Sequence, residues 1–219
     1  MVPIIGVSDQ THLTNISEDK DAWPVYMTVG NILCRTRNCP VKIPVLLLTL
    51  LPVPPKFTRK SACANEALLQ TNADTLRAVF DPVLPPLQPV AQEEMVIYCA
   101  DGKIRNYLTL LSAWIVDHAE HPALEGIGSK TCPKCEVPCE ELSGDPRRIY
   151  ETYNYMRYRE KALWHVPAQV AGIAEYFKRL GIKIGNNVFI GLDQVSPADL
   201  HKLDLLHKIY LGLFKHMME

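Results

Sequence analysis

Two aspartates in this chain each follow an apolar run, a position at which a carboxylate can do chemistry. Asp9 comes directly after the run Val2–Ser8, and Asp101 comes directly after the run Met95–Ala100. Val- and Ile-rich runs of this length are typical of buried strands. Carboxylates at the ends of neighbouring strands supply the oxygen ligands that Mg²⁺ prefers, and two-metal phosphoryl transfer needs several of them together. The two aspartates are therefore candidates for binding Mg²⁺ or Mn²⁺, with a turn or capping role as the alternative.

The cysteine spacing predicts a second kind of site. Cys132 and Cys135 are separated by two residues, so both thiolates can reach one tetrahedral Zn²⁺. Asp204 and His207 are three residues apart on a predicted helix, which places them on one face, where they can complete the ligand set. Cys139 is a further candidate for the fourth ligand. Two alternatives stay open, namely a thiol redox motif for the cysteines and a solvated helix face for the Asp–His pair.

The composition describes a globular chain with no global basic field. The chain has 219 residues, of which 47% are hydrophobic and 21% charged, and its formal net charge is -1. This composition fits a protein that buries a hydrophobic core, and the near-zero net charge indicates no general affinity for nucleic acid. We expect no secretion signal, because Met1 leads straight into a strand-like run. We also expect no membrane partner, because the longest apolar stretch, residues 43–53, is broken by prolines and too short to span a bilayer.

The elements that must position these residues follow from hydrophobic periodicity. A meander of strands is predicted over 2–8, 23–29 and 45–51, and a further strand over 94–100. Helices are predicted over 64–80, 104–118, 147–164, 167–180 and 199–218, with a Cys-bearing loop over 126–144. This order predicts an α+β or α/β fold, with a core over residues 1–120 and a mainly helical region over residues 121–219.

Taken together, these segments resemble the Plavaka transposases, a CACTA-like family of DNA transposases with an RNase H-like fold. The resemblance is carried by blocks that stand in the family's order and span nearly the whole chain. These blocks are Ser8–Thr14, Trp23–Asn31, Ala100–Lys103 with Leu110–Asp117, Cys132–Pro138, and Asp204–His207 continuing to His216.

The resemblance implies roles for the candidate residues. Asp9 and Asp101 match the first two acids of a DDE triad that holds catalytic Mg²⁺ or Mn²⁺. The CxxC pair, Cys132 and Cys135, and the DxxH pair, Asp204 and His207, match the family's motifs and would bind a structural Zn²⁺. Residues 1–120 would then be a partial RNase H-like core, and residues 121–219 a helical zinc-binding insertion that ends in the DxxH helix.

The resemblance also sets expectations for function. The parent enzyme would cut and join transposon-end DNA in the nucleus, and homo-oligomer formation is left open. The family's final catalytic glutamate lies after the DxxH motif, and Glu219 stands too close to that motif to match it. We therefore expect a transposase fragment that does not cut DNA by itself. The alternative is a non-enzymatic, zinc-stabilised module, derived from a transposon, that binds DNA or protein.

Overall fold

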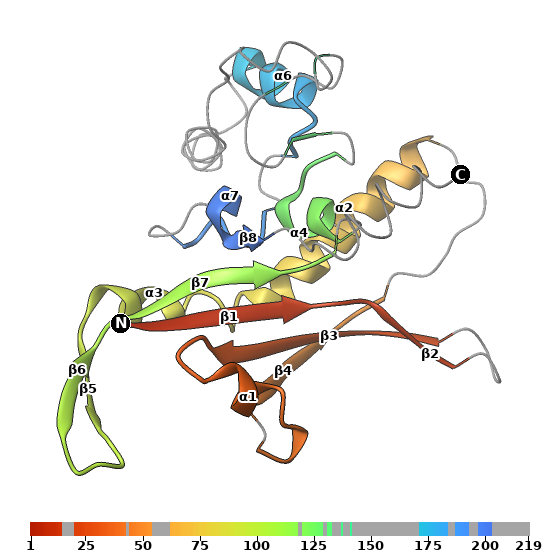
Figure 1. The fold of residues 1–219 in the computed structure, drawn as a ribbon. Coiled ribbons are helices and arrows are strands. Elements are labelled where there is room, and N and C mark those ends of the chain that lie inside the picture. Colours follow the sequence, from red (N-terminus) through yellow and green to blue (C-terminus); the bar gives the residue numbers. More distant parts are fainter. Residues whose placement is uncertain are drawn as a thin grey trace.

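The computed structural model describes residues 1–14, 20–42, 44–53, 62–117, 120–128, 131–132, 137, 141, 171–183, 187–192 and 197–202. Within these residues the fold is a mixed α+β arrangement with one main sheet, a separate hairpin and several helices (Figure 1). The broad fold class predicted from the sequence is therefore confirmed. The predicted helix over 147–164 lies outside the described residues.

The main sheet comprises six strands in the part of the chain that the structure describes. They are β1 (Val2–Ser8), β2 (Thr11–Thr14), β3 (Lys20–Val29), β4 (Val45–Leu51), β7 (Thr109–Ile115) and β8 (His201–Lys202). The long β3 pairs antiparallel with β1, β2 and β4, which confirms the predicted meander. On its other side, β1 pairs parallel with β7, and β7 pairs parallel with β8.

The prediction of a helix over residues 104–118 is wrong. These residues form β6 (Ile104–Tyr107) and then β7. The register of β7 against β1 slips at Ser112, so Ile4 faces Leu111 while Ile5 faces Ala113. This bulge shifts the phase of the strand, and the buried residues Leu111 and Trp114 are consequently three apart. A spacing of three imitates a helix, which is why periodicity alone failed here.

The strand predicted over residues 94–100 exists, but it belongs to a separate hairpin. β5 (Met95–Tyr98) pairs antiparallel with β6 and with no strand of the main sheet. The hairpin leads into β7 at Thr109, which is level with Val2 at the start of β1. Figure 1 shows it projecting beyond the main sheet beside the N-terminus.

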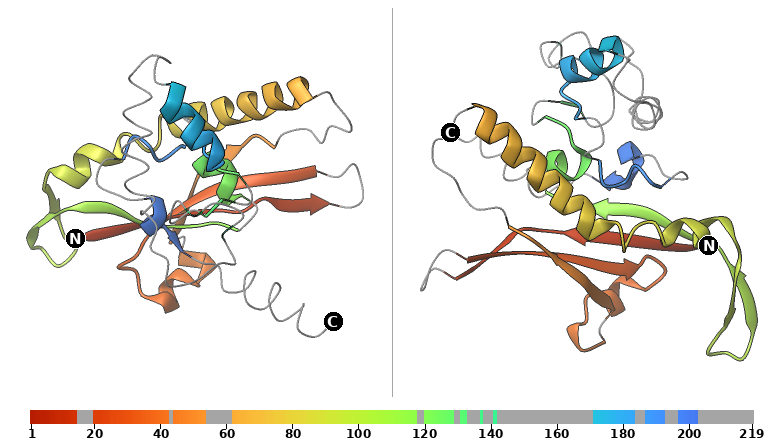
Figure 2. Two further views of the ribbon diagram at one scale, coloured as in Figure 1. Left: turned by 90° about the horizontal axis from the view of Figure 1, so that it is seen from above. Right: turned by 180° about the vertical axis from the view of Figure 1, so that it is seen from behind.

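The helices lie mainly on one side of the main sheet, as the front and back views show (Figures 1 and 2). Their bounds are α2 (Ala62–Phe80), α3 (Leu87–Gln92), α4 (His121–Glu125), α6 (Ala171–Arg179) and α7 (Pro197–Leu200), while the short α1 (Cys34–Arg37) and the 3-10 turn η1 (Pro40–Lys42) join β3 to β4. α2 matches its predicted range closely and stops before Pro82, as a proline requires. None of the helices that the structure describes is both long and apolar enough to cross a bilayer.

Two predicted helices near the C-terminus are only partly described. α6 covers the later part of the predicted helix 167–180, and Gly181 ends it with a left-handed φ of 75°. Of the predicted helix over 199–218, residues 199–200 are helical as the end of α7, but residues 201–202 form β8, and residues 203–219 lie outside the described residues. One edge strand of the main sheet, β8, therefore comes from the part of the chain after residue 120.

A core of aromatic and aliphatic side chains joins the sheet to the helices. Trp114 of β7 is fully buried, and its ring stacks edge-on against Phe80 of α2 at 5.6 Å and against Phe189 at 5.2 Å between centroids. Val188, Phe189, Leu192 and Leu200 belong to this same core. Segments on both sides of residue 120 are therefore packed into one hydrophobic unit.

Candidate functional site

Two aspartates lie just beyond the main sheet, at the carboxyl ends of two neighbouring strands. β1 and β7 run parallel, and their last paired residues are Val7 and Ile115. Asp9 and Asp117 each stand two residues beyond that pair, at the carboxyl ends of neighbouring strands. Asp9 is exposed and Asp117 is half-buried. The parallel pairing therefore places Asp9 and Asp117 just beyond the same end of neighbouring strands, and Asp117 is not among the residues predicted from the sequence.

Glu120 forms hydrogen bonds with Asp117 and with both chain neighbours of Asp9. One of its carboxylate oxygens, Oε1, accepts a short hydrogen bond from the backbone N–H of Gln10, and the other, Oε2, accepts one from the Ser8 hydroxyl at 3.1 Å. Its own backbone N–H donates to Asp117 Oδ1 at 2.8 Å. Burial raises the pKa of the Glu120 carboxyl, and the bond from the Gln10 N–H opposes that rise. The side chain thus links the chain around Asp9 to the chain after β7.

Trp114 joins β7 to β1 close to these strand ends. Trp114 Nε1 donates to Ser8 Oγ at 3.2 Å, so Ser8 bonds both Trp114 and Glu120. The Trp114 ring lies against Gly6, where an added Cβ would come within 2.2 Å of Cε3. The lack of a side chain at Gly6 is therefore what lets the ring lie flat on β1.

The expectation that Asp9 and Asp101 end neighbouring strands of one sheet is wrong. Asp101 lies in the turn of the β5–β6 hairpin, where Gly102 adopts a left-handed φ of 76°. That hairpin meets the main sheet at Val2, the opposite end of β1 from Asp9. The length of β1, roughly 3.3 Å for each residue, separates the two carboxylates, so they cannot share one metal ion in this arrangement.

Asp101 instead forms an ion pair within its own hairpin. Arg105 donates to both carboxylate oxygens, at 2.8 and 2.6 Å, and the backbone N–H of Lys103 adds a third bond at 3.2 Å. The Arg105 guanidinium is the main cause of the lowered pKa of the Asp101 carboxyl. All these groups are exposed or half-buried, so the pair contributes little to stability.

A signal for Asp117 was present in the sequence but was hidden by the predicted helix. Asp117 follows the apolar run 109–116 in the same way that Asp9 follows its own run. Reading residues 104–118 as one helix placed Asp117 at a helix end rather than at a strand end. Glu120 had no comparable signal, because its role depends on contacts with residues 8 and 10.

The predicted zinc ligands lie almost entirely outside the described residues. Cys135, Cys139, Asp204 and His207 are not described, whereas Cys132 is described and half-buried. Thr131, just before Cys132, donates to the carbonyl of Leu180 at 2.9 Å, and the N–H of Gly128 donates to the Gly181 carbonyl at 2.7 Å. Within the described ranges, no group of three or more His, Cys, Asp or Glu residues is arranged to hold a metal ion.

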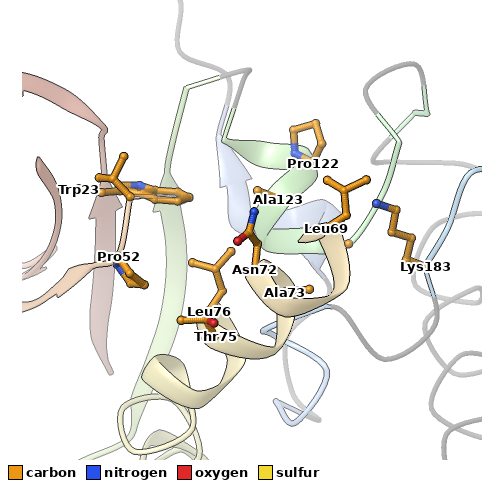
Figure 3. A pocket seen from close by; sticks show the side chains of 12 residues that line it. Trp23, Pro52, Leu69, Asn72, Ala73, Thr75, Leu76, Pro122, Ala123 and Lys183 are labelled. Atoms are coloured by element: carbon orange, nitrogen blue, oxygen red, sulfur yellow. The ribbon is translucent and has the colours of Figure 1, made fainter. Parts of the chain in front are cut away.

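A cavity of about 330 Å³ lies between α2, α4 and the ends of β3 and β4 (Figure 3). Apolar side chains such as Trp23, Leu69 and Leu76 form most of its wall, and Asn72 and Thr75 add polar groups. Among the described residues that line it, Lys183 is the ionisable one. The described residues that line the cavity therefore include no carboxylate, thiol or imidazole.

Comparison with known proteins shows which family this chain belongs to. A search of curated proteins finds no match to this chain. The family model of the Plavaka transposases, by contrast, matches residues 1–219, the whole chain. The chain therefore belongs to the Plavaka transposase family.

Proposed function

We propose that the main sheet is an RNase H-like catalytic core of a DNA transposase, and that Asp9 and Asp117 are its first two metal-binding acids. The observation that carries the proposal is the sheet itself. Its order, β4-β3-β1-β7-β8, joins an antiparallel meander to two strands parallel to β1, and both acids follow strands of the parallel pair. Family membership supports the same function. Asp101 is replaced as the second acid because its hairpin stands at the other end of β1.

The donor set fits a hard divalent cation. Mg²⁺ keeps several of its waters and is commonly held by one or two carboxylates together with substrate phosphates. Asp9 is exposed, and Asp117 uses only Oδ1 for its bond with Glu120, so both can take part in such a site. Bound there, Mg²⁺ or Mn²⁺ would stabilise the charge that develops on the attacked phosphate. The protein's own task is to hold the two carboxylates at neighbouring strand ends.

The substrate class follows from the family. A Plavaka transposase acts on transposon DNA, and metal-dependent strand cleavage and transfer would be the activity of the parent enzyme. The near-neutral charge of this chain offers little phosphate neutralisation, so we propose weak and salt-sensitive DNA binding by the chain itself. The nucleus is the proposed location, since that is where the DNA lies.

A structural zinc site is proposed for the region after β7. Its ligands would be Cys132, Cys135 and His207, with Asp204 or Cys139 as the fourth. One support is the CxxC spacing. The other is the pair of hydrogen bonds that joins residues 128 and 131 to the end of α6, because these bonds hold the backbone just before Cys132. This region is inserted between β7 and β8 of the sheet.

Mn²⁺ affinity tests the acid assignment. We expect Asp9→Asn and Asp117→Asn each to weaken Mn²⁺ binding, measured by calorimetry, by at least about tenfold, or ~1.4 kcal/mol. Asp101→Asn is the matched control and should leave the affinity unchanged. If Asp101→Asn weakened binding and Asp117→Asn did not, the second acid would be Asp101 and the sheet argument would fail.

The alternative function is a zinc-stabilised module that binds DNA or protein without catalysis. It is favoured by the lack of a three-residue metal group in the described part of the chain. A chain that holds zinc but binds no Mn²⁺ through Asp9 would establish this alternative.

A further inference from the structure

We infer that Glu120 is a positioning residue that fixes the Asp9 carboxylate at the proposed metal site. The inference rests on the proposed function, because it assigns Glu120 a task toward the metal-binding acids. Glu120 would not touch the metal or the DNA. It would act by holding the backbone on both sides of Asp9 in one conformation.

The two carboxylate oxygens of Glu120 accept hydrogen bonds from the residues on either side of Asp9, and we call this pair of hydrogen bonds the bracket. One accepts from the hydroxyl of Ser8, the residue before Asp9, and the other accepts from the N–H of Gln10, the residue after it. β1 ends at Ser8 and β2 begins at Thr11, so residues 9 and 10 belong to neither strand. The carboxylate of Glu120 thus restrains a segment that the sheet does not hold.

The bracket is closed through the neighbouring strand. The N–H of Glu120 bonds the Asp117 carboxylate, and the indole N–H of Trp114, on β7, bonds Ser8. Two routes therefore connect the Asp9 segment to β7, one through Trp114 and one through Glu120. Because a metal site requires its ligands at a set spacing, such outer contacts set the affinity of the site.

Burial separates the role of Glu120 from that of a metal ligand. Glu120 is 5% exposed and Ser8 is 1% exposed, whereas Asp9 faces solvent. Both oxygens of Glu120 already accept hydrogen bonds from the protein. A metal ion bound by Glu120 would have to reach this buried carboxylate, whereas a positioning role needs only the hydrogen bonds that are already present.

Two substitutions distinguish positioning from metal binding. In Glu120→Gln, the amide oxygen can still accept from Gln10 and the amide N–H can donate to Ser8 Oγ. Glu120→Ala removes both bonds. A positioning role therefore predicts that Gln rescues what Ala loses, because the bracket needs hydrogen bonds and not charge.

Two measurements on the full chain are made for each variant. Amide hydrogen exchange at Gln10, followed by NMR, reports the bracket without any metal. Mn²⁺ affinity, measured by calorimetry, reports the acids. We expect Glu120→Ala to speed exchange at Gln10 and to weaken Mn²⁺ binding by about 10- to 100-fold. We expect Glu120→Gln to stay close to wild type in both measurements.

The outcomes separate the inference from the proposed function. Equal losses of Mn²⁺ affinity in the Gln and Ala variants would make Glu120 a ligand and overturn positioning, and so would wild-type behaviour of Glu120→Ala. If Glu120→Ala does not fold, Ser8→Ala, which removes one bond of the bracket, must show faster Gln10 exchange and weaker Mn²⁺ binding, or the inference fails. If the wild-type chain binds Mn²⁺ no better than Asp9→Asn, the proposed function fails, while Gln10 exchange still reports on the bracket.

Discussion

Replacing Gly6 with alanine should destabilise the core and disturb the candidate site above it. The new Cβ would lie 2.2 Å from Trp114 Cε3, 2.4 Å from Cζ3 and 2.9 Å from Cδ2, whereas ordinary contacts begin near 3.4 Å. The ring must therefore move by more than 1 Å. It cannot do so freely, because Trp114 is fully buried between Phe80 and Phe189.

The expected cost follows from overpacking a closed core. Inserting a methyl group into a packed interior costs about 1–3 kcal/mol, and we expect Gly6→Ala near the upper end, because the clash is with a rigid ring. With a urea m-value of about 2–3 kcal/mol/M, the midpoint of unfolding should fall by about 1 M. The displaced ring would also pull its indole N–H away from Ser8 Oγ, so Mn²⁺ affinity should fall as well.

Urea unfolding followed by far-UV circular dichroism is the assay. Gly172→Ala is the matched control, because a Cβ at Gly172 meets nothing within 4 Å and α6 gains a better helix former. We expect this control to unfold at the wild-type midpoint or slightly above it. A Gly6→Ala chain that unfolds together with the control would refute the packing of Trp114 on β1.

Four further predictions concern other parts of the chain. Burial raises the pKa of Glu125 to about 8, far above its value of about 4.3 in an unfolded chain. The free energy of unfolding should therefore fall as pH rises between these two values. Glu125→Gln should have a higher urea midpoint than wild type at pH 8.5 but not at pH 4. An equal increase in the midpoint at both pH values would contradict the raised pKa of Glu125. Arg105→Ala should leave the urea midpoint unchanged, because its pair with Asp101 is open to solvent. Elemental analysis should find one zinc per chain, and chelation should loosen the region from Cys132 onward; zinc-free protein purified without chelator would exclude the site. Supercoiled plasmid should stay intact with Mg²⁺ or Mn²⁺, because the described residues hold no group of three metal-binding side chains, and nicking that disappears in Asp117→Asn would overturn this expectation.

Local patterns were sufficient for the first half of the fold. The strands over 2–8, 23–29 and 45–51 are read directly from short apolar runs, and the helix ending at Phe80 is read from its spacing and from Pro82. These features depend on neighbours in the chain, so their signals are local. The turn role that is the alternative for Asp101 is also local, and Asp101 and Gly102 lie in the turn of a hairpin.

The partners of β1 were beyond the reach of local patterns. β1 pairs with a strand more than a hundred residues away, and no periodicity states which strand lies beside which. The bulge at Ser112 then gave β7 the spacing of a helix, so the run before Asp117 was misread. Family resemblance could supply the order of the motifs, but not the spatial neighbour of Asp9.

Asp9 could therefore be proposed as an acid from sequence alone, whereas its neighbours Asp117 and Glu120 were decided by tertiary structure. Asp9 has a sequence signal because its own strand precedes it. The place of Asp117 beside it follows from parallel pairing between distant strands, and the role of Glu120 follows from two hydrogen bonds across more than a hundred residues. Such contacts form only when the hydrophobic core around Trp114 brings β1 and β7 together, and that packing is a property of the whole fold.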